Sequence, residues 1–142
     1  MGSDYFAYGS NMNFKQMQLR CPGALFEGTA KLDNWKYYIN SDGYAGIEKS
    51  PSDFVLGCLW KLTDRHWQTL DQYEAVDEGF YFKKKIPVFS DKNSSEINAV
   101  VYLSSNTDYG IPTKSYQQGV LDGACEAGLP KDYVLGLRNW AE

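Results

Sequence analysis

The sequence is poor in the side chains that most metalloenzymes and thiol enzymes use. It contains one histidine, His66, and three cysteines, Cys21, Cys58 and Cys125, which lie far apart and form no C-x-x-C pair. A zinc site needs several such ligands, and a nucleophilic serine or cysteine usually needs a histidine partner. The shortage argues against Ser-His and Cys-His hydrolases and most metallohydrolases, so we expect no metal and no cofactor. Scattered cysteines of this kind are typical of reduced, mostly buried thiols in a cytoplasmic protein.

Long apolar runs and a basic surface are also missing. No stretch approaches the roughly 18 apolar residues of a membrane span, and residues 1–4 lack the basic and apolar segments of a secretory signal. The net charge is −4, and strand alternation would divide the densest positive run, Lys83-Lys84-Lys85, between two faces. We therefore expect no nucleic acid or membrane partner, a cytoplasmic location, and a monomer or homodimer.

What the sequence does contain is the composition of one folded domain that is rich in tyrosine. Its 142 residues, 43% hydrophobic and 23% charged, predict a single domain over residues 1–142. Aromatic residues make up 15% of the chain, and 11 of them are tyrosines. Tyrosine has an apolar ring and a polar tip, so it suits the wall of a polar pocket. Aromatic strand positions in a β-rich fold explain any single one equally well.

Hydrophobic alternation and turn residues predict an α+β fold, with a mostly β body and helices packed on it. The expected strands cover residues 4–8, 27–32, 35–40, 44–48, 54–62, 81–89 and 97–104. Turns are expected at 9–11, 33–34, 42–43 and 50–53. Helices are expected over 14–20 after the cap Asn13, 64–74 after the cap Thr63, 114–127 before Gly128, and 131–140.

One candidate for acid–base chemistry stands at the end of the second expected helix. Trp67, Leu70 and Glu74 are spaced by three and four residues, so they share one helix face. If Trp67 and Leu70 face the core, Glu74 points the same way, and burial would raise its pKa toward the range useful for a general base. The alternative is that the helix frays here and Glu74 is solvated.

A second candidate is the segment from Tyr5 to Met12, in which a strand runs into Gly9-Ser10-Asn11 ahead of a helix. Such a turn exposes backbone N–H groups that can hold a carboxylate or a phosphate, and Gly9 allows close approach of a ligand. The alternative is an ordinary strand-to-helix turn. Ser10 is a poor candidate for a nucleophile, because the chain has no G-x-S-x-G motif and no second histidine.

Motifs of one known family occur in order along nearly the whole chain. Residues 5–12 resemble Y-x-Y-G-S-N-L/M, and Ser50-Pro51 with residues 57–62 resembles S-P-G-D…W-G-V-x-W/Y-x-L. Residues 70–76 resemble L-D-x-x-E-G-V, and residues 79–81 the G-x-Y that follows it. Tyr116, ahead of Gly128-Leu129-Pro130, resembles a C-terminal helix with a substrate-contacting tyrosine. Together these motifs resemble the AIG2-like gamma-glutamylcyclotransferase family, in its Y-G-S-N branch.

The resemblance implies a small mixed β-barrel flanked by helices and a cofactor-free reaction. In that reaction the alpha-amine of a small-molecule gamma-glutamyl substrate attacks its own gamma-carbonyl and releases 5-oxoproline and an amine. Glu74 would be the catalytic base. The residues expected to bind the substrate are Tyr5, Phe6, Ala7, Tyr8, Gly9, Ser10, Asn11, Tyr81 and Tyr116.

Two departures from the family pattern concern loop geometry and substrate size. Ser52 replaces the usual glycine after Ser50-Pro51, and Ala75 replaces the glycine after the glutamate. Other functions stay open at this point: a cyclotransferase for gamma-glutamylamines, an enzyme that trims a gamma-glutamylated biosynthetic intermediate, a hydrolase that uses water, and a non-catalytic binding module of the same fold.

Overall fold

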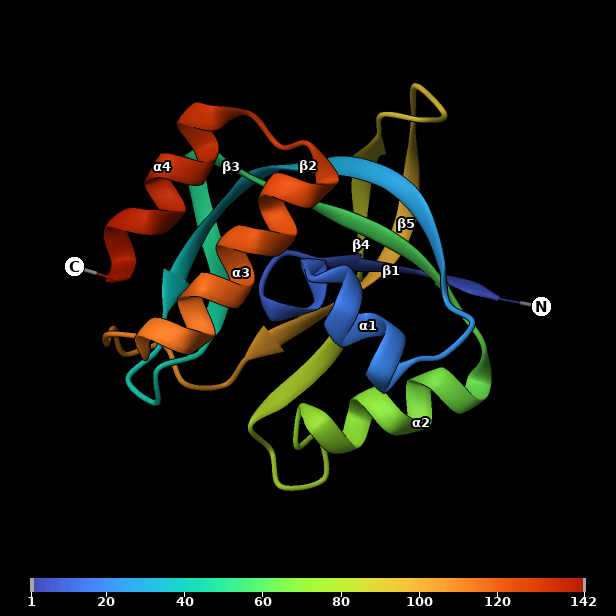
Figure 1. Cartoon of the computed structure of the whole chain (residues 1–142), viewed down its shortest axis with the longest axis horizontal. Helices are drawn as coiled ribbons and strands as arrows, with labels where there is room; N and C mark the ends of the chain where they lie inside the picture. Colours follow the sequence, from blue (N-terminus) through green and yellow to red (C-terminus); the bar gives the residue numbers. More distant parts are fainter. Residues whose placement is uncertain (1, 142) are drawn as a thin grey trace.

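The protein, described by a computed structural model over residues 2–141, is a closed barrel of five strands with helices against its outside (Figure 1). The strands are β1 (Ser3–Ala7), β2 (Leu25–Ile39), β3 (Ala45–Leu62), β4 (Tyr81–Ser90) and β5 (Ser95–Ser104). The helices are α1 (Phe14–Arg20), α2 (Asp64–Tyr73), α3 (Lys114–Ala127) and α4 (Lys131–Arg138), with short 3-10 turns η1 (Ser10–Met12) and η2 (Asn139–Ala141). The predicted α+β class and the mixed β-barrel are confirmed.

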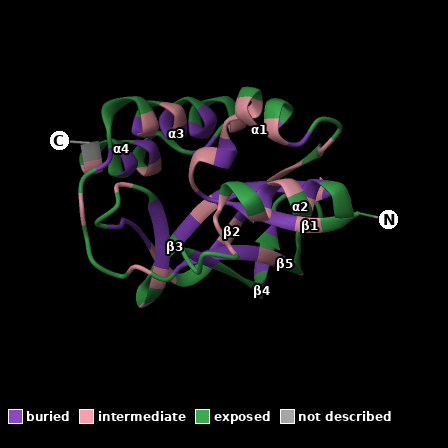
Figure 2. Cartoon of the chain, turned by 90° about the horizontal axis from the view of Figure 1, so that it is seen from below, coloured by how far each residue is buried: buried purple, intermediate pink, exposed green. Residues whose placement is uncertain are grey.

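The barrel follows the order β1-β3-β2-β4-β5, and most of its pairs are antiparallel. It closes through a parallel contact between β1 and β5, at Tyr5 and Val100. Helices α3 and α4 lie next to each other on one flank, whereas α1 and α2 follow β1 and β3 toward the other end (Figure 1). Buried side chains such as Phe6, Leu59 and Val101 belong to one hydrophobic core, and Figure 2 shows buried residues on the strands and on part of α3.

Two of the expected turns are wrong, because the strands on either side of them are continuous. Asn34 has φ of 70°, and the β2–β3 register shifts between Asp33 and Trp35. Facing it, the pairing passes from Lys49 to Phe54, so the predicted turn at 50–53 is the other side of the same irregularity. These turn-forming residues therefore make a bulge inside a long hairpin, and they do not reverse the chain.

The helix predictions are close to the structure. Asn13 caps α1 by accepting a bond from the Gln16 N–H, and Gly128 ends α3 in the left-handed conformation at φ of 86°. Helix α2 ends at Tyr73, one residue earlier than expected, and residues 139–141 form η2 where α4 was expected to continue. Residues 9–11 do not form a simple turn, because Ser10 begins the 3-10 turn η1.

The cysteines form no disulfide in the described part of the chain. Cys21 and Cys58 are buried, as predicted, but Cys125 is exposed on α3. Residues 83–85 are all exposed on β4, so the alternation of the strand does not bury any of the three lysines.

Candidate active site

The segment between β1 and α1 is organised around the buried side chain of Asn11. Its Nδ2 donates to the Tyr5 hydroxyl at 2.9 Å, and its Oδ1 accepts from Gln16 Nε2 and Arg20 Nη1, each at 3.1 Å. Its backbone oxygen accepts from Trp60 Nε1 on β3. With partners in β1, α1 and β3, Asn11 fixes the loop against the barrel and orients the Arg20 guanidinium.

The start of η1 presents backbone donors to solvent or to a ligand. The N–H groups of Gly9, Ser10 and Asn11 make no hydrogen bond to the described residues. A Cβ at Gly9 would stand 2.9 Å from that of Ala45 and 3.5 Å from the Tyr116 hydroxyl. Glycine is therefore required here because β3 and α3 approach the backbone closely.

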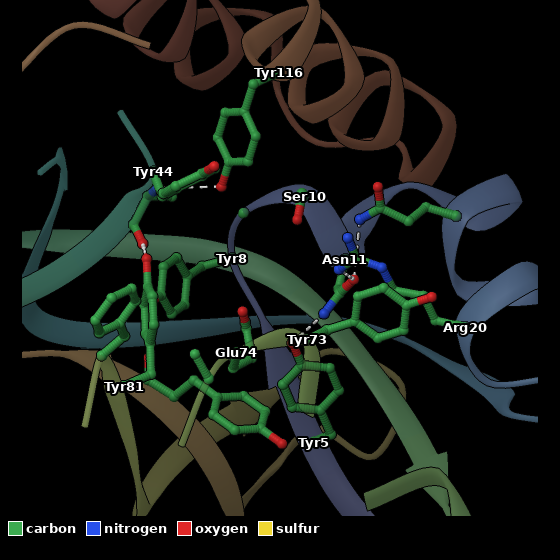
Figure 3. A pocket seen from close by; sticks show the side chains of 16 residues that line it. Tyr5, Tyr8, Ser10, Asn11, Arg20, Tyr44, Tyr73, Glu74, Tyr81 and Tyr116 are labelled. Atoms are coloured by element: carbon green, nitrogen blue, oxygen red, sulfur yellow. Dashed lines mark hydrogen bonds between the residues drawn. The ribbon is translucent and has the colours of Figure 1, made fainter. Parts of the chain in front are cut away.

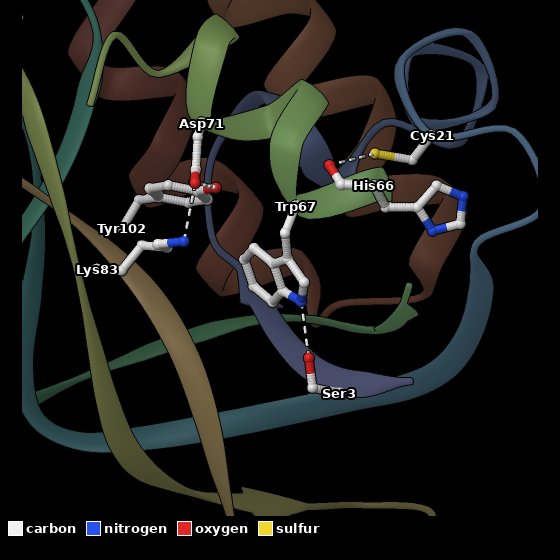
Figure 4. A network of polar contacts seen from close by, with 7 residues as sticks. All are labelled: Ser3, Cys21, His66, Trp67, Asp71, Lys83 and Tyr102. Atoms are coloured by element: carbon white, nitrogen blue, oxygen red, sulfur yellow. Dashed lines mark hydrogen bonds and ion pairs between the residues drawn. The ribbon is translucent and has the colours of Figure 1, made fainter. Parts of the chain in front are cut away.

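Helix α2 is fixed at its N-terminus by a capping box and by His66. Thr63 accepts from the His66 N–H, and His66 Nδ1 accepts from the Thr63 N–H at 3.1 Å. With Nδ1 acting as acceptor, Nε2 carries the proton and donates to the Pro22 carbonyl at 2.7 Å. The Cys21 thiol lies 3.9 Å from the His66 carbonyl (Figure 4). The single histidine is thus an anchor between α2 and the chain that follows α1.

The rest of α2 is held against the barrel through its inner face (Figure 4). Trp67 Nε1 donates to the Ser3 hydroxyl at 2.7 Å. One turn later, Asp71 accepts from the Tyr102 hydroxyl at 2.6 Å and pairs with Lys83 at 2.9 Å. Contacts to β1, β4 and β5 therefore fix the end of the helix, where Glu74 is the first residue beyond it.

Glu74 is partly buried, and its carboxylate has no ionic or hydrogen-bonding partner among the described residues. Its backbone N–H donates to the Leu70 carbonyl at 2.8 Å, which continues the helical geometry for one residue. Burial raises the pKa of Glu74 to about 7, partly opposed by the positive charge of Arg20. The helical geometry thus extends from Leu70 to Glu74, as the expected common helix face requires. With a pKa near 7, the Glu74 carboxyl group can exchange a proton near neutral pH.

Glu74 faces a cavity of about 380 Å³ between β1, η1, α1 and the start of β3 (Figure 3). Of the residues predicted to bind substrate, Tyr5, Tyr8, Gly9, Ser10, Asn11, Tyr81 and Tyr116 line it together with Glu74. Phe6 and Ala7 are not among the lining residues. They are fully buried in the core, where the Phe6 ring and the Ala7 carbonyl pack against Gly57. The alternation of β1 turns Phe6 to the side opposite Tyr5.

The tyrosine hydroxyls of the cavity differ in what they can offer a ligand. Tyr8 and Tyr81 donate to the carbonyls of Tyr102 and Ala45, at 2.6 and 2.7 Å, so their protons are already engaged. Tyr116 accepts from the Ala45 N–H at 3.1 Å and keeps its own proton. Burial raises the pKa of Tyr116 to about 12, so this hydroxyl remains a donor at neutral pH.

Several lining residues were missed by sequence reasoning: Gln16, Arg20, Tyr44, Ala45, Tyr73, Ala75, Phe80 and Tyr102. Gln16 and Arg20 are four residues apart on α1, so helical spacing already placed them on one face. Ala45 and Tyr102 reach the cavity only through the pairing of distant strands, for which a single sequence gives no signal.

Two findings concern what residues 2–141 lack. No group of three or more His, Cys, Asp or Glu side chains is arranged so that it could hold a metal ion. No helix in this range is long and apolar enough to span a membrane.

The barrel and the cavity built on the Y-G-S-N loop define a class of proteins to which the chain can be compared. Residues 54–137 match the model of the AIG2-like family. The chain belongs to this AIG2-like, gamma-glutamylcyclotransferase family.

Similar proteins of this family are named as gamma-glutamylcyclotransferases. The gamma-glutamylcyclotransferases of Mus musculus and Homo sapiens are each 34% identical to it, over 94% of this chain and 76% of theirs. A solved structure of a gamma-glutamyl cyclotransferase superposes with a TM-score of 0.90 at 32% identity, covering 97% of this chain and 87% of that one.

Proposed function

We propose that this protein acts as a gamma-glutamylcyclotransferase with Glu74 as its general base. The observation that carries the proposal is a partly buried carboxyl group with a pKa raised to about 7, unpaired, in the same cavity as the free N–H groups of η1. Leaving this carboxylate without a partner costs folding free energy, which the alpha-ammonium of a bound substrate offsets.

The substrate's own alpha-amine is the nucleophile in this mechanism. Glu74 removes a proton from the alpha-ammonium, and the free amine attacks the gamma-carbonyl carbon to form a five-membered ring. Holding the glutamyl chain bent makes the attack intramolecular, with an effective molarity of the order of 10⁵ M or more. The aromatic walls supplied by Tyr5, Tyr8 and Tyr81 restrict the bent chain and exclude water from the reacting atoms.

The tetrahedral intermediate carries a negative oxygen, for which the loop supplies donors. The N–H groups of Gly9, Ser10 and Asn11 are fixed in direction by the Asn11 network, so they stabilise the oxyanion without reorganisation. Protonated Glu74 then gives its proton to the leaving nitrogen and takes the second proton of the ring nitrogen, which became positively charged when it attacked the carbonyl. The C–N bond breaks, and 5-oxoproline and an amine or amino acid leave. Glu74 passes this second proton to the departing amine, which leaves as an ammonium, so the base is regenerated and no cofactor is needed.

The proposed activity covers a range of leaving groups, because the outer part of the cavity is open. Tyr44 and Phe80 at the rim of the cavity are 52% and 60% exposed. Such a rim accepts varied leaving groups, including amino acids, simple amines and larger biosynthetic intermediates. Incubation with a panel of these gamma-glutamyl compounds, followed by mass spectrometry, identifies both the preferred substrate and the chemistry. Release of 5-oxoproline supports cyclisation, and release of glutamate supports hydrolysis.

A substrate acetylated on its alpha-nitrogen tests the nucleophile directly. Acetylation removes the basicity of the amine, so we expect no turnover even when the compound is shown by competition to bind. Cleavage of the acetylated compound to N-acetylglutamate would show that water attacks, and the cyclisation mechanism would be wrong.

The proposal also covers the location and the oligomeric state of the enzyme. We infer a cytoplasmic enzyme that meets small gamma-glutamyl compounds there, and one that works as a monomer or homodimer. Sedimentation of the purified protein across a concentration series distinguishes the two states.

A further inference from the structure

Arg20 brings a fixed positive charge to the cavity. It lies in the last turn of α1, where its Nη1 donates to Asn11 Oδ1 at 3.1 Å. Its guanidinium lies over the ring of Tyr73, 4.2 Å from the centroid (Figure 3). Two contacts of this kind hold the planar group in one orientation and leave several of its N–H donors unused.

The charge of Arg20 has no protein carboxylate to neutralise it. None of the five ion pairs within residues 2–141 includes it. Of the residues that line the cavity, only Arg20 is a cation and only Glu74 an anion, and the two are not within 4.0 Å of each other. The cavity therefore presents one separated pair of opposite charges.

We propose that Arg20 binds the alpha-carboxylate of the glutamyl group, an assignment that rests on the function proposed above. A glutamyl group carries one ammonium and one carboxylate on the same carbon, which matches the separated charges of Glu74 and Arg20. Two guanidinium N–H groups can bind a carboxylate in parallel, with specific geometry. The N–H groups of η1 are then free for the oxyanion.

This orientation also assigns a side of the cavity to the leaving group. In the view of Figure 3, Tyr44 and Tyr116 lie at the upper left of the cavity, above Glu74, whereas Arg20 lies at its right. With the carboxylate at Arg20 and the gamma-carbonyl at η1, the leaving group extends toward these two tyrosines. The protein thus recognises the glutamyl part by charge and the leaving group by neutral aromatic contact.

The test removes the carboxylate from the substrate and the guanidinium from the protein in turn. A 4-aminobutyryl amide is a gamma-glutamyl amide without its alpha-carboxylate, and it cyclises by the same attack to 2-pyrrolidinone. For the wild type we expect kcat/KM to fall about 10- to 100-fold from the gamma-glutamyl to the 4-aminobutyryl compound. For Arg20→Gln, the kcat/KM values of the two compounds should lie within about threefold of each other. Arg20→Lys should give a ratio of kcat/KM values between those of wild type and Arg20→Gln. The control Arg65→Gln, at an exposed position, should give the same ratio as wild type.

Binding without turnover separates this assignment from the proposed activity. Wild-type protein should bind 5-oxoproline more tightly than 2-pyrrolidinone, and Arg20→Gln should lose most of that difference. If Arg20→Gln does not fold, Arg20→Lys replaces it and should lose part of the difference. If the variant loses this discrimination while the wild type turns over no substrate, the assignment of Arg20 to the alpha-carboxylate is supported and the proposed activity is wrong. If the variants discriminate like wild type, the assignment is overturned. It is also overturned if they lose activity only on substrates whose leaving group carries a carboxylate, because Arg20 then binds the leaving group.

Discussion

At the scale of single residues, the cavity depends on two groups that are left without the partner their charge would ordinarily find. Within residues 2–141, the Glu74 carboxylate accepts no hydrogen bond and the Arg20 guanidinium pairs with no carboxylate. Both arrangements cost folding free energy, and both leave an interaction for a substrate to complete.

Glu74→Gln should keep the fold and lose kcat by about 10²- to 10⁴-fold, because an amide cannot take up the proton of the alpha-ammonium. Steady-state kinetics on the best gamma-glutamyl substrate measures the loss. Glu78→Gln, an exposed change four residues away, serves as the control and should retain full activity. A near-normal kcat for Glu74→Gln would show that Glu74 is not the base.

Glu74→Gln should also be more stable than wild type above the pKa of Glu74. The pKa of Glu74 rises from an ordinary 4.5 to about 7 in the folded state, so between these values the folded protein holds a proton that the unfolded chain has released. Stability therefore falls as pH rises through this window, and the cost of up to about 3 kcal/mol is complete above it. Denaturant unfolding at pH 5 and pH 8 should show Glu74→Gln gaining on wild type, with Glu78→Gln unchanged. A pH-independent difference would contradict the raised pKa.

The residues of the cavity were partly predictable. Helical spacing pointed to Glu74, and family motifs added the loop and both of the more distant tyrosines, Tyr81 and Tyr116. Phe6 was wrongly included because a motif does not say which face of a strand a residue occupies. Arg20 was missed because its position in the cavity depends on the angle at which α1 leaves the barrel, which tertiary packing decides.

At the scale of elements, α3 sets the position of the catalytic loop by packing directly on η1. A Cβ at Gly123 would stand 2.5 Å from the Asn13 nitrogen and 2.5 Å from the Met12 carbonyl carbon. These are backbone atoms, which cannot rotate away. The crossing of α3 over the loop therefore requires glycine at this position.

Gly123→Ala should lower the free energy of unfolding by about 1–3 kcal/mol and reduce kcat, because α3 and η1 must separate. Gly119→Ala lies on the same helix with nothing within 4 Å of the added Cβ, and it should stabilise by up to about 1 kcal/mol with normal activity. Chemical denaturation and kinetics on both variants make the comparison. Equal effects would show that α3 does not position the loop.

The turn between α2 and β4 contains a strained residue. Ala75 has φ of 52°, a conformation that favours glycine, which is the residue that the family pattern has here. Ala75→Gly should therefore raise the free energy of unfolding by about 0.5–1 kcal/mol, whereas Ala127→Gly in α3 should lower it by a similar amount. Thermal unfolding of the pair measures both. Destabilisation by Ala75→Gly would mean that the strain is not present in solution.

Elements were predicted better than their connections. Caps fixed the start of α1 and α2 because Asn13 and Thr63 satisfy backbone donors locally. Residues 33–34 and 50–53 have the composition of turns, and only the pairing of β2 with β3 turns them into a bulge. Local chemistry decides a helix end, but it does not decide whether a strand continues.

At the scale of the whole molecule, the reaction proposed here depends on shape and protons alone. We expect turnover to proceed without added metal and to be unaffected by a strong chelator, because neither the base nor the oxyanion donors involve an ion. Kinetics before and after exhaustive chelation checks this. Loss of activity that a divalent ion restores would contradict it.

The parallel contact of Tyr5 with Val100 also has a consequence for the order of assembly. The first strand takes its place between β3 and β5, so the barrel closes late, through pairings of high contact order. During synthesis, β1 and the loop that follows it must wait for β5 to leave the ribosome before both edges of β1 are covered. A nascent chain halted before β5 can contain Glu74 and the whole Y-G-S-N loop and still be inactive, so activity should appear abruptly with chain length.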